Sequence, residues 1–395
     1  MHHLKRALAL LMCLAVLFCA GCSAPRPQDT EGTSELQYIF VHGLSGWGRY
    51  DKIYRIAPYW GTRNGDLMEY LGAEGYRCHA ASVDPIGSAW DRACELYAQL
   101  TGSVVDYGAE HSARCSHERF GTDYTDDPLI PDWNAGGKIV LLGHSFGGAT
   151  IRLFAEILAN GSAAEQAATD AADLSPFFLG GQGDRLHALV TLAAPTNGTT
   201  AYDLWDDPNF DPASVNVPKS EILMGKLFSG GSGGERDGRI EDDYAAYDMH
   251  IDNALALNAT IETRPDVYYF AVPCAASYPG RNGTQVPKTT WMEGMFRKTS
   301  RYMGAYSGIT AGGVVIDDSW KENDGLVNTI SSYAPIGAPA QAYDPNNIQP
   351  GVWNEMPVFQ GDHMSIIGGM TIKKDVRPYY LNLLQMIDAL PPVSS

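Results

Sequence analysis

The sequence predicts an α/β fold built on a mostly parallel central sheet flanked by helices. Four runs of apolar and β-branched residues are nearly continuous, which is typical of strands buried on both faces. Helical patterns lie between them, and this alternation favours parallel strands joined by helices. The strand-like runs are residues 36–43, 138–145, 186–195 and 266–273. The clearest helical patterns cover residues 66–76 and 147–160.

The composition indicates a folded protein that does not bind nucleic acid. The chain has 395 residues, of which 45% are hydrophobic, so a core can form in one large or two ordinary domains. Its formal net charge is −18, whereas nucleic-acid binding rewards basic surfaces. The Gly/Ser-rich segment 228–238 is expected to be a surface loop.

The N-terminus predicts export. Two basic residues precede an apolar run from Ala7 to Phe18, and small residues follow, as in a signal peptide over residues 1–21. "CAGC" resembles the lipobox of bacterial lipoproteins, so Cys22 is expected to carry a lipid that anchors the protein to the cell membrane. The alternative is a secretory signal that is cleaved without lipidation. A retained membrane helix is disfavoured, because the apolar run is shorter than the roughly 20 residues that span a bilayer.

The rest of the chain divides into a tether and one large domain. Residues 22–35 are polar and lack apolar periodicity, so the folded domain is expected to cover residues 36–395. Between about 50 and 135 the clearest strand-like run is "CHAASV" at 78–83. This interval is therefore predicted to hold helices and an inserted subdomain.

Four cysteines lie in the predicted folded domain. They permit three disulfide pairings, which the sequence does not rank, and they are too few to act as the scaffold of the fold. The four are Cys78, Cys94, Cys115 and Cys274.

A candidate nucleophile lies between a strand and an amphipathic helix in residues 138–157. The motif Gly-His-Ser-Phe-Gly at 143–147 predicts a sharp turn, in which the glycines leave space beside the serine and expose its hydroxyl. Because the strand and the helix are both present, Ser145 is the predicted nucleophile. The alternative is an ordinary Gly-rich turn.

A serine hydroxyl needs a histidine to take its proton and a carboxylate to orient that histidine. His363 follows a strand-like run late in the chain and lies on a predicted loop, which is where a fold with this strand–serine–helix turn places its base. Between the nucleophile and this histidine, Asp317, Asp318 and Asp324 are all candidates for the acid. Residue order alone does not choose among them.

The tetrahedral intermediate of ester hydrolysis needs two backbone N–H groups for its negative oxygen. The Gly-rich segment "FVHGLSGWG" at 40–48 follows the first predicted strand and can supply one of them. The residue after the nucleophile supplies the other. The predicted donors are Leu44 and Phe146.

A second cluster of chemically active residues lies in "GAEHSARCSHERFG" at 108–121. It places His111 and His117 six positions apart, with Cys115 between them. From these residues alone, a solvated loop and a metal site are both open interpretations.

Taken together, these motifs resemble the staphylococcal and Geobacillus type of true lipases within the α/β-hydrolase superfamily. The resemblance extends from about residue 38 to 385. The specific pieces are "HGLSGWGR", "YWG", "WDRACELYAQLTGSVVDYGAEH", "HERFG", "GHSFGG", "APTNGTT", "WKENDGLVNT" and "GVWNEMPVFQGDH". The family's acid is the Asp of its "ENDG" segment, so the resemblance implies Asp324, with His363 as the base.

The resemblance also implies a structural zinc ion in the inserted subdomain. Three of the family's ligands match Asp91, His111 and His117, and one carboxylate with two imidazoles suits tetrahedral zinc. The family's motif for the fourth ligand is missing from the shortened segment 200–247. The candidates left open are Asp206, Asp237, Asp242 and Cys115.

Two family features are expected to differ in this chain. The lid region, at about 200–247, offers only a short helix at 218–229, whose apolar face would hold Ile222, Leu223, Leu227 and Phe228. A short packed core helix is the alternative. The calcium ligands of the family correspond to Ser365 and Met370, which are poor ligands for a hard cation, so that site is expected to be absent. A relocated site using Asp362 or Asp375 is the alternative, and Ile366 and Ile367 are the expected anchors of the loop.

The sequence therefore predicts an exported serine ester hydrolase of lipase type, acting on acylglycerols or other carboxylic esters through an acyl-enzyme. It is expected to be a monomer whose contact with the membrane comes from its lipid anchor. A carboxylesterase for short or soluble esters is a second interpretation. A surface lipid-binding protein without catalysis is a third, from another class.

Overall fold

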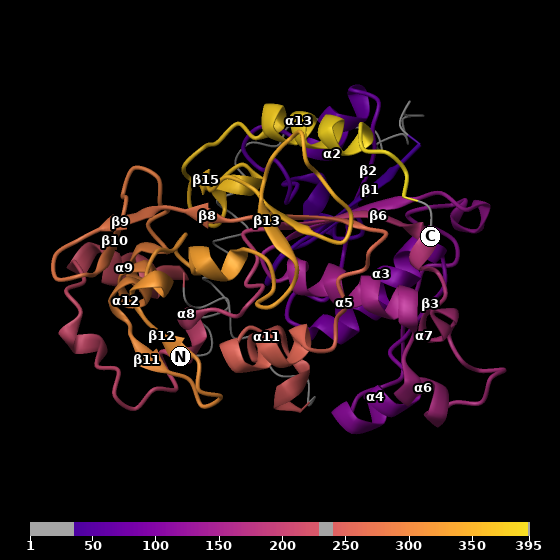
Figure 1. Ribbon diagram of the computed structural model, residues 1–395, viewed down its shortest axis with the longest axis horizontal. Coiled ribbons are helices and arrows are strands. Elements are labelled where there is room, and N and C mark those ends of the chain that lie inside the picture. The colour runs from indigo at the N-terminus through magenta and orange to yellow at the C-terminus, as the bar shows by residue number, and fades with distance from the viewer. Residues whose placement is uncertain (1–34, 229–239, 394–395) are drawn as a thin grey trace.

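The computed structural model describes residues 35–228 and 240–393, and Figure 1 shows their arrangement. The predicted signal peptide, Cys22, nearly all of the tether and most of the Gly/Ser-rich segment lie outside these residues. Within the described ranges, no helix has both the length and the apolar character needed to cross a membrane.

A seven-stranded sheet with every neighbouring pair parallel forms the centre of the molecule. This confirms the predicted fold class. The strand order is β13-β14-β7-β6-β5-β1-β2. The strands are β1 (Gln37–Val41), β2 (Arg77–Ala81), β5 (Ile139–His144), β6 (Leu186–Leu192), β7 (Tyr268–Val272), β13 (Ala340–Ala342) and β14 (Trp353–Glu355).

Helices cover both faces of this sheet (Figure 1). On one face, α3 (Ala89–Thr101) packs against α5 (Gly147–Asn160), and both contribute to the larger apolar core. On the other face, α2 (Leu67–Ala73) and α13 (Arg377–Asp388) pack together over a second core. The four predicted strand runs became β1, β5, β6 and β7 because each is buried along nearly its whole length.

The remaining elements lie around this layered centre. The other helices are α4 (Ala109–Cys115), α6 (Ala163–Ala168), α7 (Pro176–Leu179), α8 (Thr200–Asp203), α9 (Lys219–Phe228), α10 (Ala245–Asp248), α11 (Ile251–Asn258) and α12 (Arg297–Ala305). The other strands form two-stranded sheets: β3 (Val104–Asp106) with β4 (Phe120–Asp123), β8 (Cys274–Ala275) with β15 (Phe359–Gln360), β9 (Ser277–Pro279) with β10 (Gln285–Pro287), and β11 (Gly308–Ile309) with β12 (Val315–Ile316).

The sheet edge formed by β13 and β14 did not follow from the residue pattern. Each strand has only three residues, which is too short for a periodic signal, and their place is set by pairing with β7. The strand-like run before His363 contributes β15 to a separate small sheet instead. All four cysteines of the domain are free thiols, so none of the three pairings forms.

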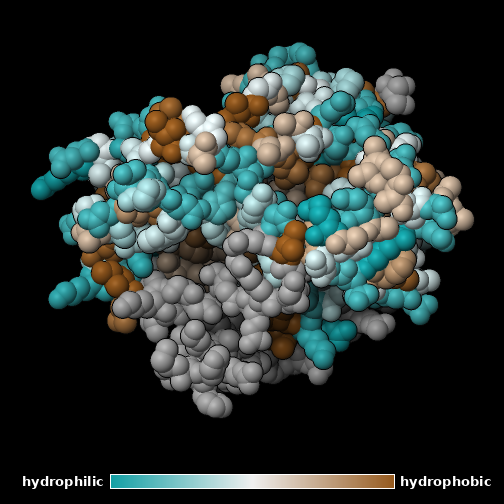
Figure 2. Space-filling view, turned by 90° about the horizontal axis from the view of Figure 1, so that it is seen from below, coloured by the Kyte–Doolittle hydropathy of each residue, from teal (hydrophilic) through white to brown (hydrophobic). Residues whose placement is uncertain are grey.

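The surface agrees with the acidic composition. The face in Figure 2 is largely hydrophilic, and its hydrophobic residues are scattered among polar ones where the residues are coloured. The described large hydrophobic side chains that are more than half exposed are Phe120, Leu179, Trp205, Leu223, Ile309, Val315 and Ile336.

Candidate active site and metal-binding cluster

The turn after β5 holds Ser145 in a strained backbone conformation. Its φ is +55°, in the left-handed region that residues with a Cβ rarely adopt. A Cβ on Gly143 would lie 2.4 Å from the carbonyl oxygen of Gly147, and one on Gly147 would lie 2.3 Å from that of Val41. Glycine is therefore required at both positions, because neighbouring backbone atoms leave no room for a Cβ. The turn presents the serine hydroxyl at the carboxyl edge of the sheet.

Three side chains that are distant in the sequence form one hydrogen-bonded chain. The hydroxyl of Ser145 lies 2.8 Å from Nε2 of His363, and Nδ1 of His363 lies 2.8 Å from Oδ2 of Asp324. Because a carboxylate only accepts, Nδ1 donates and Nε2 is left to accept the serine proton. The amides of Leu326 and Val327 donate to Oδ1 of Asp324 at 3.0 and 2.8 Å. All three side chains of the chain are at least 93% buried.

The structure separates the three aspartates that the sequence offered as acids. Asp317 accepts a hydrogen bond from the amide of Ser319 and caps a short 3-10 helix. Asp318 is 83% exposed and pairs with Lys321 at 2.7 Å. Of the three, Asp324 is the one that contacts the buried histidine.

Two backbone amides are available beside the serine. In the described part of the chain, neither Leu44 nor Phe146 donates its N–H to a protein acceptor. Gly43 approaches so closely that a Cβ there would lie 2.5 Å from the serine Cβ. The buried guanidinium of Arg92 donates to the carbonyl of His42 and lies 5.0 Å from the ring centroid of Phe146. It therefore supports both of the segments that carry the predicted donors.

A buried hydrogen-bond chain links the loop after β1 to the loop of His363, which the sequence did not reveal. The amide of Gly43 donates to the hydroxyl of Tyr59 at 3.1 Å. The same hydroxyl lies 2.6 Å from Nδ1 of His144. On the other side of its ring, His144 places Nε2 2.9 Å from the carbonyl of His363. The carbonyl can only accept, so Nε2 of His144 carries the proton and Nδ1 accepts from the tyrosine. Burial, and then the neighbouring His363, lowers the pKa of His144 well below its usual value, so this imidazole is neutral.

Replacing Tyr59 with Phe removes the central member of this chain. The change leaves a buried donor on Gly43 and a buried acceptor on His144 without partners, which costs about 1–3 kcal/mol for each group. We expect kcat for a soluble ester to fall on the order of tenfold while KM changes little, because the two loops are positioned less well. Tyr54→Phe is the matched control, since its hydroxyl bonds to Asp66 elsewhere. Equal kinetics for the two variants would contradict the positioning role.

The loop after His363 is fixed by a buried carboxylate from another segment. Oε1 of Glu293 accepts hydrogen bonds from three consecutive amides, those of Met370 (3.0 Å), Thr371 (2.6 Å) and Ile372 (2.7 Å). Glu293 is 2% exposed. The carboxylate of Glu293 accepts hydrogen bonds from N–H groups that this irregular loop would otherwise leave buried and without a partner.

Asp362 continues this arrangement. Its Oδ2 accepts the amide of Glu293 at 2.6 Å, and its Oδ1 accepts the hydroxyl and amide of Ser365 at 2.7 and 3.0 Å. Burial raises the pKa of Asp362 to about 6. Asp375 instead pairs with Arg377 at 2.8 Å on the surface. The two acidic residues proposed for a relocated calcium site are thus engaged with protein partners.

We expect activity and melting temperature to be independent of calcium. The resemblance had implied that Ser365 and Met370 replace the family's calcium ligands, and the predicted anchors Ile366 and Ile367 are buried at 0% and 1% exposure. The measurement compares EGTA-treated protein before and after calcium is added, with zinc held saturating. A calcium-dependent rise in either quantity would contradict this prediction.

A cluster of imidazoles and carboxylates lies where α3, α4 and the segment before α10 meet. Nε2 of His111 lies 3.0 Å from Oδ1 of Asp91 and 3.3 Å from Oδ1 of Asp243. Nε2 of His117 lies 3.7 and 3.5 Å from the same two carboxylates. Ligand atoms about 2.0–2.1 Å from a tetrahedral ion are separated by roughly 3.3 Å, so these spacings suit such an ion.

Two atoms in this cluster lack any hydrogen-bond partner although they are buried. They are Nε2 of His117 and Oδ2 of Asp243. Nδ1 of His117 lies 2.8 Å from the carbonyl of Glu118, so Nδ1 carries the proton and Nε2 presents a lone pair. A cation between these atoms would satisfy both of them.

Two of the fourth-ligand candidates from the sequence have other partners. Asp206 lies 3.5 Å from His250, and Asp242 pairs with Arg114 at 3.3 Å. Asp237 lies outside the described residues. None of these three is placed in the cluster by the structure.

Asp243, which sequence analysis missed, lies beside both histidines. An antiparallel bridge between Gly87 and Tyr244 brings it beside the start of α3, a contact that no local motif indicates. Cys115 was also a candidate, and its Sγ lies 3.8 Å from Nδ1 of His111. One group able to hold a metal ion, with ligand atoms within 4.8 Å of one another, comprises His111, Cys115, His117 and Asp243.

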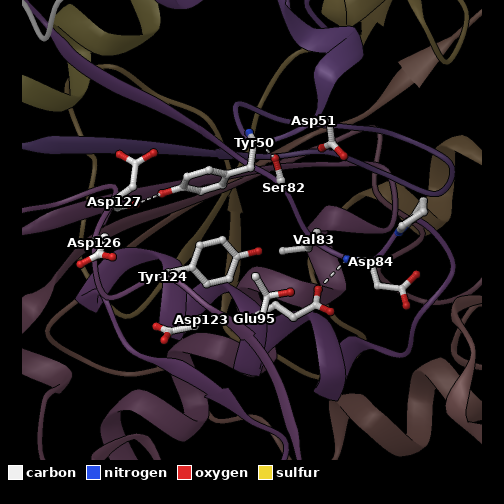
Figure 3. Close-up of a pocket in the computed structure, with 12 residues that line it drawn as sticks. Tyr50, Asp51, Ser82, Val83, Asp84, Glu95, Asp123, Tyr124, Asp126 and Asp127 are labelled. Carbon is white, nitrogen blue, oxygen red and sulfur yellow. Dashed lines mark hydrogen bonds between the residues drawn. The ribbon is translucent and has the colours of Figure 1, made fainter.

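A cavity of about 800 Å³ opens elsewhere, and its lining includes Tyr50 and Tyr124 (Figure 3). Six carboxylates line it: Asp51, Asp84, Glu95, Asp123, Asp126 and Asp127. Burial raises the pKa of Glu95 to about 8, and its oxygens accept from the amide of Asp84 and the hydroxyl of Tyr107. None of Ser145, His363 and Asp324 lines this cavity. Its carboxylate-rich lining does not suit the apolar acyl group of an ester.

The chain belongs to the family described as "Lipase-like, C-terminal domain", which it matches over residues 35–211 and 238–385. It is 33% identical to Lipase 2 of Staphylococcus aureus over 359 residues, and 30% identical to Lipase 1 of S. aureus strain MRSA252 over 366 residues. Each alignment covers 84% of this chain and 50% of the relative. The chain thus spans about half the length of these relatives.

Solved structures of similar proteins support the same assignment. EstA from Clostridium botulinum superposes with a TM-score of 0.79 at 27% identity, covering 99% of both chains. The Staphylococcus hyicus lipase gives 0.73 at 27% identity, covering 93% of this chain and 98% of its own. Lipase 1 from Pelosinus fermentans gives 0.73 at 30% identity, covering 91% of this chain and all of its own.

Proposed function

We propose that this protein is a serine ester hydrolase of lipase type, acting on acylglycerols or other carboxylic esters. The observation that carries the proposal is the continuous hydrogen-bond chain from Ser145 through His363 to Asp324 at a strained strand-to-helix turn. Membership of the lipase-like family supports it.

The side chains divide the reaction between them. Nε2 of His363 takes the hydroxyl proton as Ser145 attacks the ester carbonyl, and Asp324 stabilises the imidazolium and keeps its orientation. The amides of Leu44 and Phe146 donate to the oxygen that becomes negative. The histidine then gives its proton to the leaving alcohol, and water hydrolyses the acyl-enzyme by the same route.

Labelling with a fluorophosphonate probe tests this assignment directly. An activated serine forms a covalent adduct, whereas a lipid-binding protein without catalysis does not. We expect one adduct per chain, mapped to Ser145 by mass spectrometry and absent from Ser145→Ala. An unlabelled wild-type protein that still binds lipid vesicles would favour the non-catalytic interpretation.

Zinc is the proposed occupant of the metal-binding cluster. Two imidazoles and two carboxylates give four N and O donors that zinc can bind in tetrahedral geometry, and the ligands would be Asp91, His111, His117 and Asp243. The ion would tie α3 and α4 to the segment before α10. Because no member of the Ser-His-Asp chain belongs to the cluster, the proposed role is structural.

A carboxylesterase for short esters remains the second candidate, and the lid region favours it. Helix α9 is short, and Glu221 on it forms a two-fold ion pair with Arg301 at 2.6 and 3.1 Å. Leu223 is 61% exposed, while Ile222 lines a cavity of about 600 Å³. The predicted face includes Leu227 and Phe228, whose side chains lie outside those described.

We expect a preference for short or medium acyl chains, with little interfacial activation. A small lid releases little apolar surface when it opens, so an emulsion gains little over a dissolved substrate. A chain-length series of p-nitrophenyl esters with emulsified triglyceride measures this. Leu223→Ser should change neither the soluble-ester rate nor the chain-length optimum by more than about twofold. A sharp rate increase above the solubility limit of the substrate would contradict the prediction.

Export and membrane tethering through a lipid on Cys22 complete the proposal. The signal peptide (1–21), the tether (22–35) and the hydrolase domain (36–395), with its insertion at about 50–135 and its lid at about 200–247, are the proposed units of a monomer. Radiolabelled palmitate incorporation that Cys22→Ala abolishes would support the anchor. Release of the wild type into the medium without a lipid would contradict it.

A further inference from the structure

A guanidinium lies buried on α5 without a counter-ion. Arg152 is 3% exposed, and its recorded hydrogen bond is from Nη1 to Oδ1 of Asn258 at 2.7 Å. Its Cζ lies 5.8 Å from the ring centroid of Trp353, and its Nε has no partner. Within the described ranges, no carboxylate lies within 4 Å of it. Burial lowers the pKa of Arg152 to about 10, so the group is charged at neutral pH.

An uncompensated buried charge is unfavourable, because the interior does not replace the hydration that the ion has lost. Partial compensation comes from the indole face and one amide oxygen. Arg152 lines a cavity of about 450 Å³, so an anionic ligand in that cavity can supply the rest of the charge compensation.

The lining of this cavity includes both polar and apolar side chains. The hydroxyl of Tyr269 accepts from the amide of Arg264 and has its own proton to donate. Nε of Arg264 also lacks a partner, although its Nη2 pairs with Asp266 at 2.9 Å. The apolar walls come from Leu189, Ile261, Ile336 and Trp353.

The two glutamates in the lining do not neutralise the guanidinium. Glu156 accepts hydrogen bonds from Asn160 and from the amide of Glu262, which directs its carboxylate toward those groups. Glu262 itself is exposed. The positive charge of Arg152 therefore faces the cavity without an internal partner.

We infer that this cavity binds a small organic carboxylate, with its anionic group against Arg152 and its short apolar body against the walls. Nε of Arg152 has no partner, and a guanidinium is the side-chain group that pairs with a carboxylate in a bidentate geometry. The volume admits a small molecule, and the apolar walls favour an organic anion over an inorganic one. The lining of this cavity includes none of Ser145, His363 and Asp324, so this is a site separate from the candidate active site. The inference does not depend on the proposed hydrolysis.

Binding is measured with sodium butyrate as the probe, by calorimetric titration and by melting temperature, at constant ionic strength with sodium chloride as the reference salt. The wild type should show saturable butyrate binding and a rise in melting temperature that chloride does not reproduce. Arg152→Met should lose the binding, and Arg152→Lys should weaken it by about tenfold, because an ammonium lacks the planar fork. Without butyrate, Arg152→Met should melt no lower than the wild type, since it removes an unpaired buried charge.

Two further variants keep the test decisive. Arg185→Met is the matched control, because Arg185 also lies over an indole, that of Trp133 (4.9 Å), and should leave butyrate binding unchanged. Ile336→Glu adds a negative charge at an exposed position of the lining, so it should weaken binding without unfolding the protein. Equal effects of chloride and butyrate on the wild type would overturn the inference. So would butyrate binding that survives Arg152→Met.

Discussion

Ser145→Ala and His363→Ala are each expected to lower kcat for a soluble ester by a factor on the order of 10⁴ or more, with little change in melting temperature. The two side chains act as one unit, since the 2.8 Å contact between Oγ and Nε2 is the path of the proton. Combining the two changes should cost little more than either one alone. Single-turnover and steady-state assays with p-nitrophenyl butyrate measure these effects.

Asp324→Asn is expected to be nearly as severe, about 10⁴-fold in kcat. An amide at this position can donate to Nδ1 of His363, which places the proton on Nε2 and prevents it from accepting the serine proton. Asp318→Asn is the matched control, because Asp318 is exposed and pairs only with Lys321. Loss of turnover in the control with retention in Asp324→Asn would show that the acid is wrongly assigned.

Asp243→Asn and His111→Ala are expected to abolish stoichiometric zinc binding and to lower the melting temperature by roughly 5 °C or more. An ion that binds only the folded state at 100 times its Kd stabilises that state by about 2.7 kcal/mol. The purified domain should contain about one zinc per chain by elemental analysis. Removal by a chelator should reproduce the melting temperature of the variants.

Asp242→Asn provides the control for the metal site. Asp242 is adjacent in the chain but pairs with the half-exposed Arg114, so its loss should change neither zinc content nor melting temperature by much. Zinc content well below one per chain in carefully prepared wild-type protein would refute the assignment. So would a larger effect from Asp242→Asn than from Asp243→Asn.

Much of the fold follows from local patterns in the sequence. The strands β1, β5, β6 and β7 and the helix α5 are long enough, and buried enough, for their hydrophobic periodicity to identify them. The turn at Ser145 is also local, because glycines two residues away on each side leave few other conformations. His363 as the candidate base follows from its place late in the chain and after a strand-like run.

Other features depend on contacts between distant segments, and no local pattern encodes them. Asp324 is distinguished from Asp317 and Asp318 by its contact with His363, 39 residues away. Family resemblance had indicated Asp324, but residue order had left the three equal.

The residues of the metal-binding cluster also fall into those indicated by the sequence and those placed by the tertiary structure. The family resemblance, carried by continuous stretches of sequence, implied Asp91, His111 and His117 as ligands, whereas the residues alone left a solvated loop open. Only the tertiary structure placed Asp243 beside His111, across 132 residues, and placed Asp242 outside the cluster. Adjacent side chains on an irregular segment point in different directions, so their roles are decided by the surface on which that segment packs.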